Sequence, residues 1–294
     1  MFSHFSQLAS NFWVMQSDFY STNSGIFLDN GQACLIDAGI YPGEICAIRS
    51  FLKEMQCMPK WMVLTHCHWD HILGPEHFPE VKIIAQEKYL SRADGISQIR
   101  ICRQVEEWET QQGLKREQSF SIPQPDETFD QNLTLKIGNL PLEFFHAPGH
   151  SEDHLIVYQP GGKILWAGDM LSDVDIPYIC DQLDNYQRTL ALLKSLDIEV
   201  LVPGHGKPTK DSTEINTRME EDIIYSSELH NRVKQQIRQG SSIDETVNSC
   251  MDMAYRNQIE NERPHRLNIE SVYQELCGQA QSSKRGWLQW MNEV

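Results

Sequence analysis

The sequence predicts an α/β fold that is followed by an all-helical C-terminal domain. Up to Pro208, short apolar runs alternate with amphipathic ones, as strands and helices do when they follow one another along a chain. Beyond Pro208 the strand signals end, and the remaining stretches carry helix-capping patterns. We therefore expect two domains, residues 1–209 and residues 210–294.

The elements expected in the first domain follow in order from these patterns. The predicted strands are QACLIDAG, KWMVLTH, VKIIAQ, LTLKI, LEFFHAPGH, the hairpin HLIVYQPGGKILWAGD and IEVLVPGHG. The predicted helices are NYQRTLALLKSL and PGEICAIRSFLKEM, and the second has an apolar face of Ile45, Ile48, Phe51, Leu52 and Met55. Residues 87–125 are polar and helical in character, and they fit either a solvated pair of surface helices or a lid over a site.

The second domain is expected to contain three helices. The first begins at a capping box from Asp211 to Glu214 and ends at Gly240, the second begins at a box from Ser242 to Glu245, and the third is NIESVYQELCGQA. We expect these helices to pack across the open edge of the cleft and to shape a substrate pocket, with a dimerisation surface as the alternative. The residues that would reach the polar end of a substrate are Tyr255, Arg256 and His265.

The composition disfavours several classes of protein. The 294 residues carry 25 Lys and Arg against 41 Asp and Glu, and the resulting net charge of -16 repels nucleic acid. No run approaches the ~18 apolar residues of a membrane span, and the first residues lack the features of a signal peptide. The eight cysteines are scattered without a CxxC pair, which is typical of free thiols. We expect a cytoplasmic protein that acts on a small molecule rather than on nucleic acid, has no membrane partner, and can form a homodimer.

Residues that can bind metals gather in four short motifs, each at the end of a predicted strand. Strand ends converge on one edge of an α/β sheet, where clefts form, and the glycines beside the ligands permit close backbone approach. The motifs are THCHWDH, APGH, AGD and PGHG, and their candidate ligands are His66, His68, Asp70, His71, His150, Asp169 and His205.

These five imidazoles and two carboxylates exceed the four ligands of a single zinc ion. They suit two divalent metals that lie ~3.5–4 Å apart, share a carboxylate and bridge a hydroxide that is nucleophilic near neutral pH. Because all the donors are nitrogen or oxygen, we expect zinc, with manganese or iron as alternatives. Asp70 and Asp169 are the carboxylates expected to take part in catalysis.

The other histidines and Cys67 have plainer interpretations. A lone histidine is more often a hydrogen-bonded structural residue than a metal ligand, and this applies to His4, His77, His230 and His265. Cys67 is expected to point away from the metals because side chains alternate at a strand end. His146 and His154 either orient ligands or belong to ordinary loops, and the position of His154 four residues after His150 favours the first role.

The motifs LIDAG, THCHWDH, APGH, AGD and PGHG, in this order, resemble those of the metallo-β-lactamase superfamily over roughly residues 10–209. The resemblance implies an αββα sandwich, in which two sheets pack face to face with helices outside. It implies that Asp37 orients ligands or anchors its loop. It also implies that Asp169 bridges two metals, the first held by His66, His68 and His150 and the second by Asp70, His71 and His205.

Within that family, a bridging aspartate with five histidines resembles the glyoxalase II and acyl-homoserine lactonase branches, which cleave thioesters and lactones. The stretch after Asp169 departs from both branches, because MLSDVDIPYIC replaces the glyoxalase II pattern and Ser172 stands where the lactonases have a tyrosine. Tyr178 lies further along and can substitute for it. We expect hydrolysis of a small ester, thioester or lactone. The alternatives are an endoribonuclease or phosphodiesterase of the same fold, a mononuclear-iron persulfide dioxygenase, and a binding protein without turnover.

Overall fold

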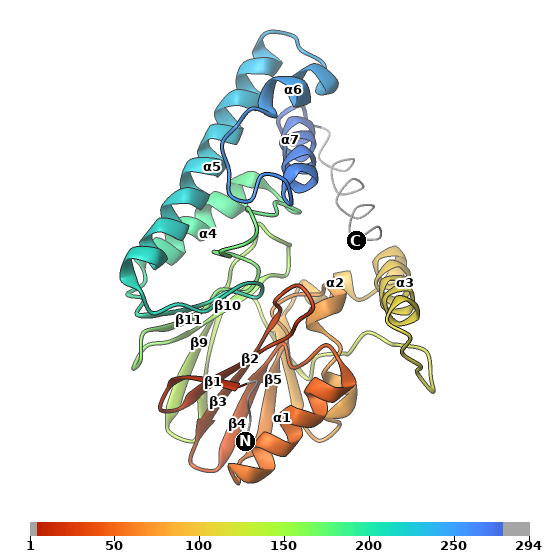
Figure 1. The fold of residues 1–294 in the computed structure, drawn as a ribbon, viewed down its shortest axis with the longest axis vertical. Coiled ribbons are helices and arrows are strands. Elements are labelled where there is room, and N and C mark those ends of the chain that lie inside the picture. Colours follow the sequence, from red (N-terminus) through yellow and green to blue (C-terminus); the bar gives the residue numbers. More distant parts are fainter. Residues whose placement is uncertain (1–4, 279–294) are drawn as a thin grey trace. The chain divides into compact units, whose positions relative to one another are not determined.

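The computed structural model describes residues 5–278, and it divides into two compact units (Figure 1). Unit 1 comprises Met1–His146 and Asp153–Gly168, and unit 2 comprises Ala147–Glu152 and Asp169–Val294. The units are defined by contacts between residues and not by the order of the chain. Ala147–Glu152 therefore belongs to unit 2, although the residues on both sides of it belong to unit 1. The domain boundary predicted after residue 209 stays a prediction.

The first β-sheet of unit 1 has the order β1-β2-β3-β4-β5-β6-β7. Neighbours are antiparallel from β1 to β4 and parallel from β4 to β7, so that helical crossovers become necessary after β4. The sequence predicted β4, β5 and β6 but not the other four strands. The strands are β1 (Phe5–Ala9), β2 (Phe12–Gln16), β3 (Asn23–Asp29), β4 (Gln32–Ile36), β5 (Met58–Val63), β6 (Lys82–Gln86) and β7 (Glu127–Phe129).

The second sheet pairs four strands of unit 1 in antiparallel fashion, and the sequence predicted these four strands and the hairpin formed by the last two. They are β8 (Asn132–Ile137), β9 (Leu140–His146), β10 (Leu155–Gln159) and β11 (Ile164–Trp166). Strands β3 and β4 contact β8, and a Cβ atom on Gly25 of β3 would lie only 2.7 Å from the Trp166 indole of β11. The two sheets therefore pack face to face, with buried aromatic side chains between them.

Helices cover the first sheet and border the loop that follows β5. Helix α1 (Pro42–Glu54) buries Ile45, Ile48, Phe51 and Leu52 as predicted, whereas Met55 is 41% exposed because it lies beyond the last turn as the C-cap. The shorter elements of unit 1 are η1 (Trp69–His71), η2 (Pro75–His77) and α2 (Tyr89–Arg92).

Helix α3 (Gly95–Gln111) is the main structure within residues 87–125. It buries Ile101, Gln104, Val105 and Trp108, and it contacts η1. One face of α3 packs into unit 1 beside a loop that carries candidate ligands, and the other face is exposed, so both expectations for this segment stay predictions.

Unit 2 consists mainly of helices, with α5 in contact with α4, α6 and α7 (Figure 1). Its elements are α4 (Leu183–Ser195), β12 (Val200–Val202), α5 (Ser212–Arg238), α6 (Ile243–Cys250) and α7 (Glu262–Leu276). The predicted helices are confirmed, and Asp211 caps α5 by accepting from the backbone N–H groups of Thr213 and Glu214. The capping box of α6 is complete, whereas Glu214 pairs with Arg218 instead of closing the box of α5.

The sequence predicts an apolar stripe on α5 of Ile223, Ile224, Leu229, Val233 and Ile237, of which Leu229 and Val233 are buried and Ile223 and Ile237 half-buried. Ile224 is 62% exposed, and Tyr225 is buried in its place. Within residues 5–278, none of the helices combines the length and the apolar character that crossing a membrane requires.

Candidate metal centre

Four of the predicted ligands lie together in unit 1, in the loop after β5. His66 and His68 occupy the irregular stretch before η1, and Asp70 and His71 belong to η1 itself. All four are buried. The Nε2 atom of His66 lies 2.9 Å from Nδ1 of His68, and Nε2 of His71 lies 3.6 Å from Oδ2 of Asp70. In both pairs the donor atoms therefore converge, as ligands of one cation do.

Asp37 determines which ring nitrogens of two of these histidines are available to a metal. Its carboxylate accepts from the Thr65 backbone N–H at 2.9 Å and from the Thr65 hydroxyl at 2.7 Å, and it lies 3.1 Å from Nδ1 of His71. Nδ1 of His71 therefore carries the proton, which leaves Nε2 as a ligand atom. Because the Thr65 hydroxyl proton is already used, its oxygen accepts from Nδ1 of His66 at 3.0 Å, and Nε2 of His66 is also left free of a proton. The expected orienting role of Asp37 agrees with these contacts.

The backbone between His66 and His68 is fixed by a residue that the sequence did not single out. Asp153 accepts from the Cys67 backbone N–H at 2.7 Å, and its other carboxylate oxygen lies 3.9 Å from Nε of Arg92. The Cys67 side chain is fully buried, and burial raises the pKa of its thiol well above the ordinary value. Cys67 thus occupies the core, as predicted.

His154 lies beside this set of ligands in unit 1. It is fully buried, and its ring centroid lies 5.4 Å from that of His66. A Cβ atom on Gly168 would lie 2.2 Å from Nε2 of His154, so the chain can pass this ring only with glycine at that position. His154 therefore packs against a candidate ligand, while His146 is half-buried at the end of β9.

The other three predicted ligands come together in unit 2 around Asp169. One oxygen, Oδ2, lies 3.3 Å from Nε2 of His150 and 3.4 Å from Nε2 of His205. Nδ1 of His150 lies 3.1 Å from the carbonyl oxygen of Tyr178 and donates to it, so Nε2 is the nitrogen that carries no proton. A single carboxylate oxygen is thereby shared between two imidazoles.

Glycines let the two histidine loops of unit 2 adopt their conformations. Gly149 has a φ of +134°, and a Cβ atom there would lie 2.4 Å from the Tyr186 Cα atom of α4. Gly206 has a φ of +100°, and Asp173 accepts from the backbone N–H of the next residue, Lys207, at 2.7 Å. Both glycines are therefore required beside the ligands, as predicted.

The distances from Asp169 to its two histidines fit metal coordination. In a tetrahedral site with metal–ligand bonds of ~2.0–2.1 Å, ligand atoms lie roughly 3.3 Å apart. The two contacts of Asp169 match this spacing, and they are longer than the ~2.7–2.9 Å of charge-assisted hydrogen bonds. A donor set of imidazoles and carboxylates suits zinc and related divalent ions. The tautomers of His66, His71 and His150 are each fixed by a second hydrogen-bond partner, as is usual for metal-binding histidines.

The loop that follows Asp169 adds two acidic residues that the sequence did not flag as part of the site. The pKa of the Asp175 carboxyl is raised above its ordinary value, mainly by burial and also by the nearby Asp169 carboxylate, whereas His205 acts in the opposite direction. The Tyr178 hydroxyl donates to Asp175 at 3.2 Å, and burial raises the pKa of this hydroxyl above its ordinary value. The short sequence spacing between Asp173, Asp175 and Asp169 was the available signal, but the contacts depend on the course of the loop.

Among the histidines predicted to be structural, His265 is fully buried between the Tyr225 hydroxyl and the Cys250 carbonyl oxygen. His77 is partly exposed beside Glu76, His230 is half-buried on α5, and His4 lies outside the described residues. The idea that His265 reaches a substrate is wrong, because both of its ring nitrogens are engaged inside the helical core.

Comparison with known families decides what kind of protein carries these residues. The model of the metallo-beta-lactamase superfamily matches residues 17–205, which include all seven candidate ligands. The chain belongs to this superfamily. The predicted αββα fold with a helical C-terminal region is confirmed.

Members of the superfamily with curated names include enzymes that are similar to this chain. An acyl-coenzyme A thioesterase, MBLAC2 of Gallus gallus, is 26% identical over 215 residues, covering 66% of this chain and 76% of the relative. A hydroxyacylglutathione hydrolase of Mesorhizobium japonicum is 24% identical over 154 residues, covering 51% and 49%. These relatives and the His/Asp groups identify the chain as a metal-binding hydrolase of the superfamily.

A solved structure extends the similarity of fold to almost the whole chain. The sec-alkylsulfatase Pisa1 from Pseudomonas sp. superposes with a TM-score of 0.69 at 15% identity. The match covers 93% of this chain and 50% of the sulfatase, so the chain spans half the length of that relative. At this identity the likeness shows the fold alone.

Proposed function

We propose that this protein is a dinuclear metal-dependent hydrolase that cleaves a small thioester, with esters and lactones as related substrates. The observation that carries the proposal is the position of Asp169. Its Oδ2 atom lies 3.3 Å from a ligand nitrogen of His150 and 3.4 Å from that of His205. The resemblance to the family assigns these two histidines to different metals, so Asp169 has the contacts that a bridging ligand needs.

The two metals would be held by two groups of residues, with zinc as the proposed ion. The first group is His66, His68, His150 and Asp169, and the second is Asp70, His71 and His205. When bound, the two cations lower the pKa of a water molecule toward neutrality and stabilise the oxyanion that forms at the substrate carbonyl.

The chain's own residues contribute by fixing the ligands before substrate binds. Asp37 and Thr65 hold the protons of His71 and His66 on Nδ1, so both Nε2 atoms are ready to coordinate. The Tyr178 carbonyl does the same for His150. Such preorganisation removes the need to reorient ligands during turnover. Hydrolysis then adds water across the acyl–sulfur bond and yields a carboxylic acid and a thiol.

Support for a thioester comes from the named relatives, and the charge of the chain opposes one alternative. A thioesterase and a hydroxyacylglutathione hydrolase are among the similar enzymes, and both names refer to hydrolysis. The net charge of -16 opposes RNA as the substrate. The eight cysteines form no disulfide, which fits the reducing cytoplasm that we propose as the compartment.

The test combines metal analysis with a substrate panel. Purified protein should hold two zinc equivalents, and it should hydrolyse acyl-coenzyme A thioesters faster than lactones, alkyl sulfates or bis-(p-nitrophenyl) phosphate. Asp169→Asn should abolish turnover, whereas Asp184→Asn, a change on the exposed first turn of α4, should not. One tightly held metal with no second under added zinc contradicts the dinuclear site. Oxygen uptake with a persulfide by iron-loaded protein would favour the dioxygenase instead.

A further inference from the structure

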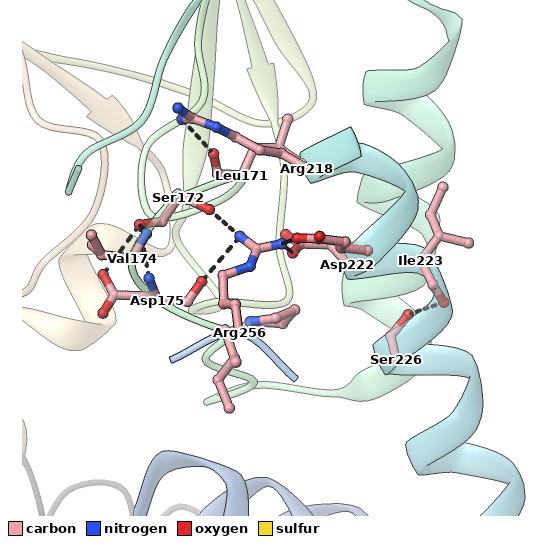
Figure 2. Close-up of polar contacts among 12 residues, drawn as sticks. Leu171, Ser172, Val174, Asp175, Arg218, Asp222, Ile223, Ser226 and Arg256 are labelled. Carbon is pink, nitrogen blue, oxygen red and sulfur yellow. Dashed lines mark hydrogen bonds and ion pairs between the residues drawn. The ribbon is translucent and has the colours of Figure 1, made fainter. Parts of the chain in front are cut away.

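The loop between Asp169 and α4 has no helix or strand of its own from Met170 to Gln182. Buried backbone N–H and C=O groups need hydrogen-bond partners, and a loop of this length cannot provide them all from within. Many of these hydrogen bonds are supplied by side chains of the C-terminal helical region, all within unit 2 (Figure 2). The way in which these side chains hold the loop points to a function for that region.

Two arginines bind the first half of the loop. Arg256, which follows α6, donates to the carbonyl oxygens of Ser172 and Asp175, and its guanidinium pairs with the buried Asp222 of α5 at 2.6 Å. Arg218 of α5 donates to the carbonyl oxygen of Leu171 at 3.3 Å. Figure 2 shows both guanidinium groups directed at these carbonyls. Arg256 is therefore engaged with the backbone and with Asp222, which does not fit the substrate contact expected from the sequence.

Two asparagines bind further backbone groups of the loop, from Val174 to Ile179. Asn261 donates to the Val174 carbonyl at 2.9 Å. Asn268 of α7 donates to the Pro177 carbonyl at 2.7 Å and accepts from the Ile179 backbone N–H at 3.0 Å. Asn268 is fully buried, and its amide brackets the backbone of the residue between these two, Tyr178.

The bracketed residue is the one that orients a candidate ligand. The Tyr178 carbonyl accepts from Nδ1 of His150 at 3.1 Å. Asn268 and His150 are thus connected through the backbone of residues 177–179 alone. At the other end of the loop, Leu171 lies two residues after Asp169 with a φ of +58°, an unfavourable conformation for leucine that Asp222 and Arg218 hold through its N–H and C=O groups.

Arg218 connects the same scaffold to the third ligand of unit 2. One terminal nitrogen of Arg218, which donates to Leu171, also lies 2.9 Å from the carbonyl oxygen of Lys207. Lys207 is two residues after His205, and its backbone N–H is held by Asp173 of the loop. The loops that follow Asp169 and His205 are therefore fixed to a common side chain from α5.

We propose that Asn268 is a positioning residue for the metal ligand His150, and that Arg256 has the same role for Asp169. The proposal rests on the proposed function, because it assumes that His150 and Asp169 bind metal. It assigns the C-terminal helical region a role in setting metal affinity through the backbone of residues 171–179. If the Tyr178 carbonyl moved, Nδ1 of His150 would lose its hydrogen-bond acceptor and the imidazole could rotate.

The experiment measures metal binding directly. Metal-free wild type, Asn268→Ala and Arg256→Lys are titrated with Zn²⁺ in competition with a chromophoric chelator, and Co²⁺ absorption spectra report ligand geometry. Loss of a partner that orients a ligand typically costs ~10–100-fold in metal affinity. We expect Asn268→Ala to weaken one of the two zinc sites by that amount and to change the Co²⁺ spectrum. Arg256→Lys keeps the charge beside Asp222 but not the two-carbonyl contact, so a smaller loss in the same direction is expected.

A matched control is available on the same helix. His265 of α7 is as buried as Asn268, and both side chains contact the Tyr225 hydroxyl. The two hydrogen bonds described for the His265 ring go to Tyr225 and Cys250. His265→Gln should therefore lower the unfolding temperature about as much as Asn268→Ala while leaving both zinc affinities unchanged.

The possible outcomes separate this inference from the proposed function. Wild type that binds fewer than two Zn²⁺ ions overturns both. Wild type with two sites and Asn268→Ala with the same affinities overturns the positioning role alone. Equal weakening by His265→Gln also overturns it, because the effect then reflects general loss of stability. If Asn268→Ala does not fold, Arg256→Lys, checked by circular dichroism, decides the question on the same criteria.

Discussion

The Oδ2 atom of Asp37, at the end of β4, lies 3.1 Å from Nδ1 of His71 in the loop after the neighbouring strand β5. Both side chains are fully buried, with no exposed surface on either. Parallel pairing of β4 with β5 brings the ends of the two strands together, so the register of the sheet fixes the contact. A feature of the fold thereby sets the tautomer of a candidate metal ligand.

Replacing Asp37 with alanine is expected to weaken metal binding by about 10–100-fold, as is typical for loss of a residue that orients a ligand. The change removes the acceptor of the His71 proton and leaves the Thr65 backbone N–H buried without a partner, at a cost of about 1–3 kcal/mol in stability. Chelator competition and thermal unfolding measure the two effects. Asp126 accepts from the Ile83 backbone N–H but has no ligand partner, so Asp126→Ala should retain full metal affinity. An unchanged affinity in Asp37→Ala would show that His71 needs no orienting carboxylate.

Gly149→Ala is expected to be among the most damaging substitutions of a small residue in the chain. Its Cβ atom would lie 2.4 Å from the α4 backbone at Tyr186, and the φ of +134° is unfavourable for any L-residue. A backbone clash of this kind predicts a loss of about 4–5 kcal/mol or more, together with displacement of His150. Gly113 also has a positive φ, of +66°, but nothing lies within 4 Å of its position, so Gly113→Ala should cost only about 1–2 kcal/mol. Equal unfolding temperatures for the two variants would refute the steric argument.

The ligand motifs could be predicted from the sequence because they combine two strong local signals. Apolar runs mark the ends of the strands, and metal-binding side chains crowd directly after them, as in THCHWDH after β5. The orienting role of Asp37 came from family resemblance, and the contact with His71 gives it a physical basis.

Other parts could not be predicted, because they depend on tertiary contacts. Strand β1 is short and has no fully buried residue, so it lacks the alternating apolar pattern that reveals a strand. Asn268 and Arg256 appear in the sequence as ordinary polar residues of a helical region. Only the folded unit shows that both bind the loop after Asp169, and that His265 is enclosed in the core.

The stability of the protein is expected to fall as the pH is lowered below about 6.5, in part because of His265. Burial lowers the pKa of this imidazole below its ordinary value. Between that lowered pKa and 6.5, the unfolded chain binds a proton that the folded chain does not, so stability rises with pH in this window. The slope from one group cannot exceed about 1.4 kcal/mol per pH unit. Thermal unfolding at several pH values should show a steeper dependence in wild type than in His265→Gln, and identical slopes would contradict the assignment.

The last prediction concerns Trp108 of α3, which packs against the loop of candidate ligands in unit 1. Its ring centroid lies 5.2 Å from that of Trp69, the residue between His68 and Asp70, and it is 5% exposed. Trp108→Ala should cost about 3–5 kcal/mol through the cavity that it leaves. Because the cavity would lie beside η1, we also expect weaker binding at the metal assigned to Asp70 and His71.

Phe51 of α1 provides the comparison for this variant. It is equally buried, but its ring stacks on Phe5 and packs at a tilt against Trp13, and it makes no ring contact with Trp69. Phe51→Ala should therefore lose a similar amount of stability while the protein keeps both zinc affinities, measured below the unfolding temperature. Trp108→Phe should restore most of the affinity, since an aromatic ring again fills the space behind Trp69. Metal binding that is equally weak in Phe51→Ala, or normal in Trp108→Ala, would mean that α3 does not support the ligand loop.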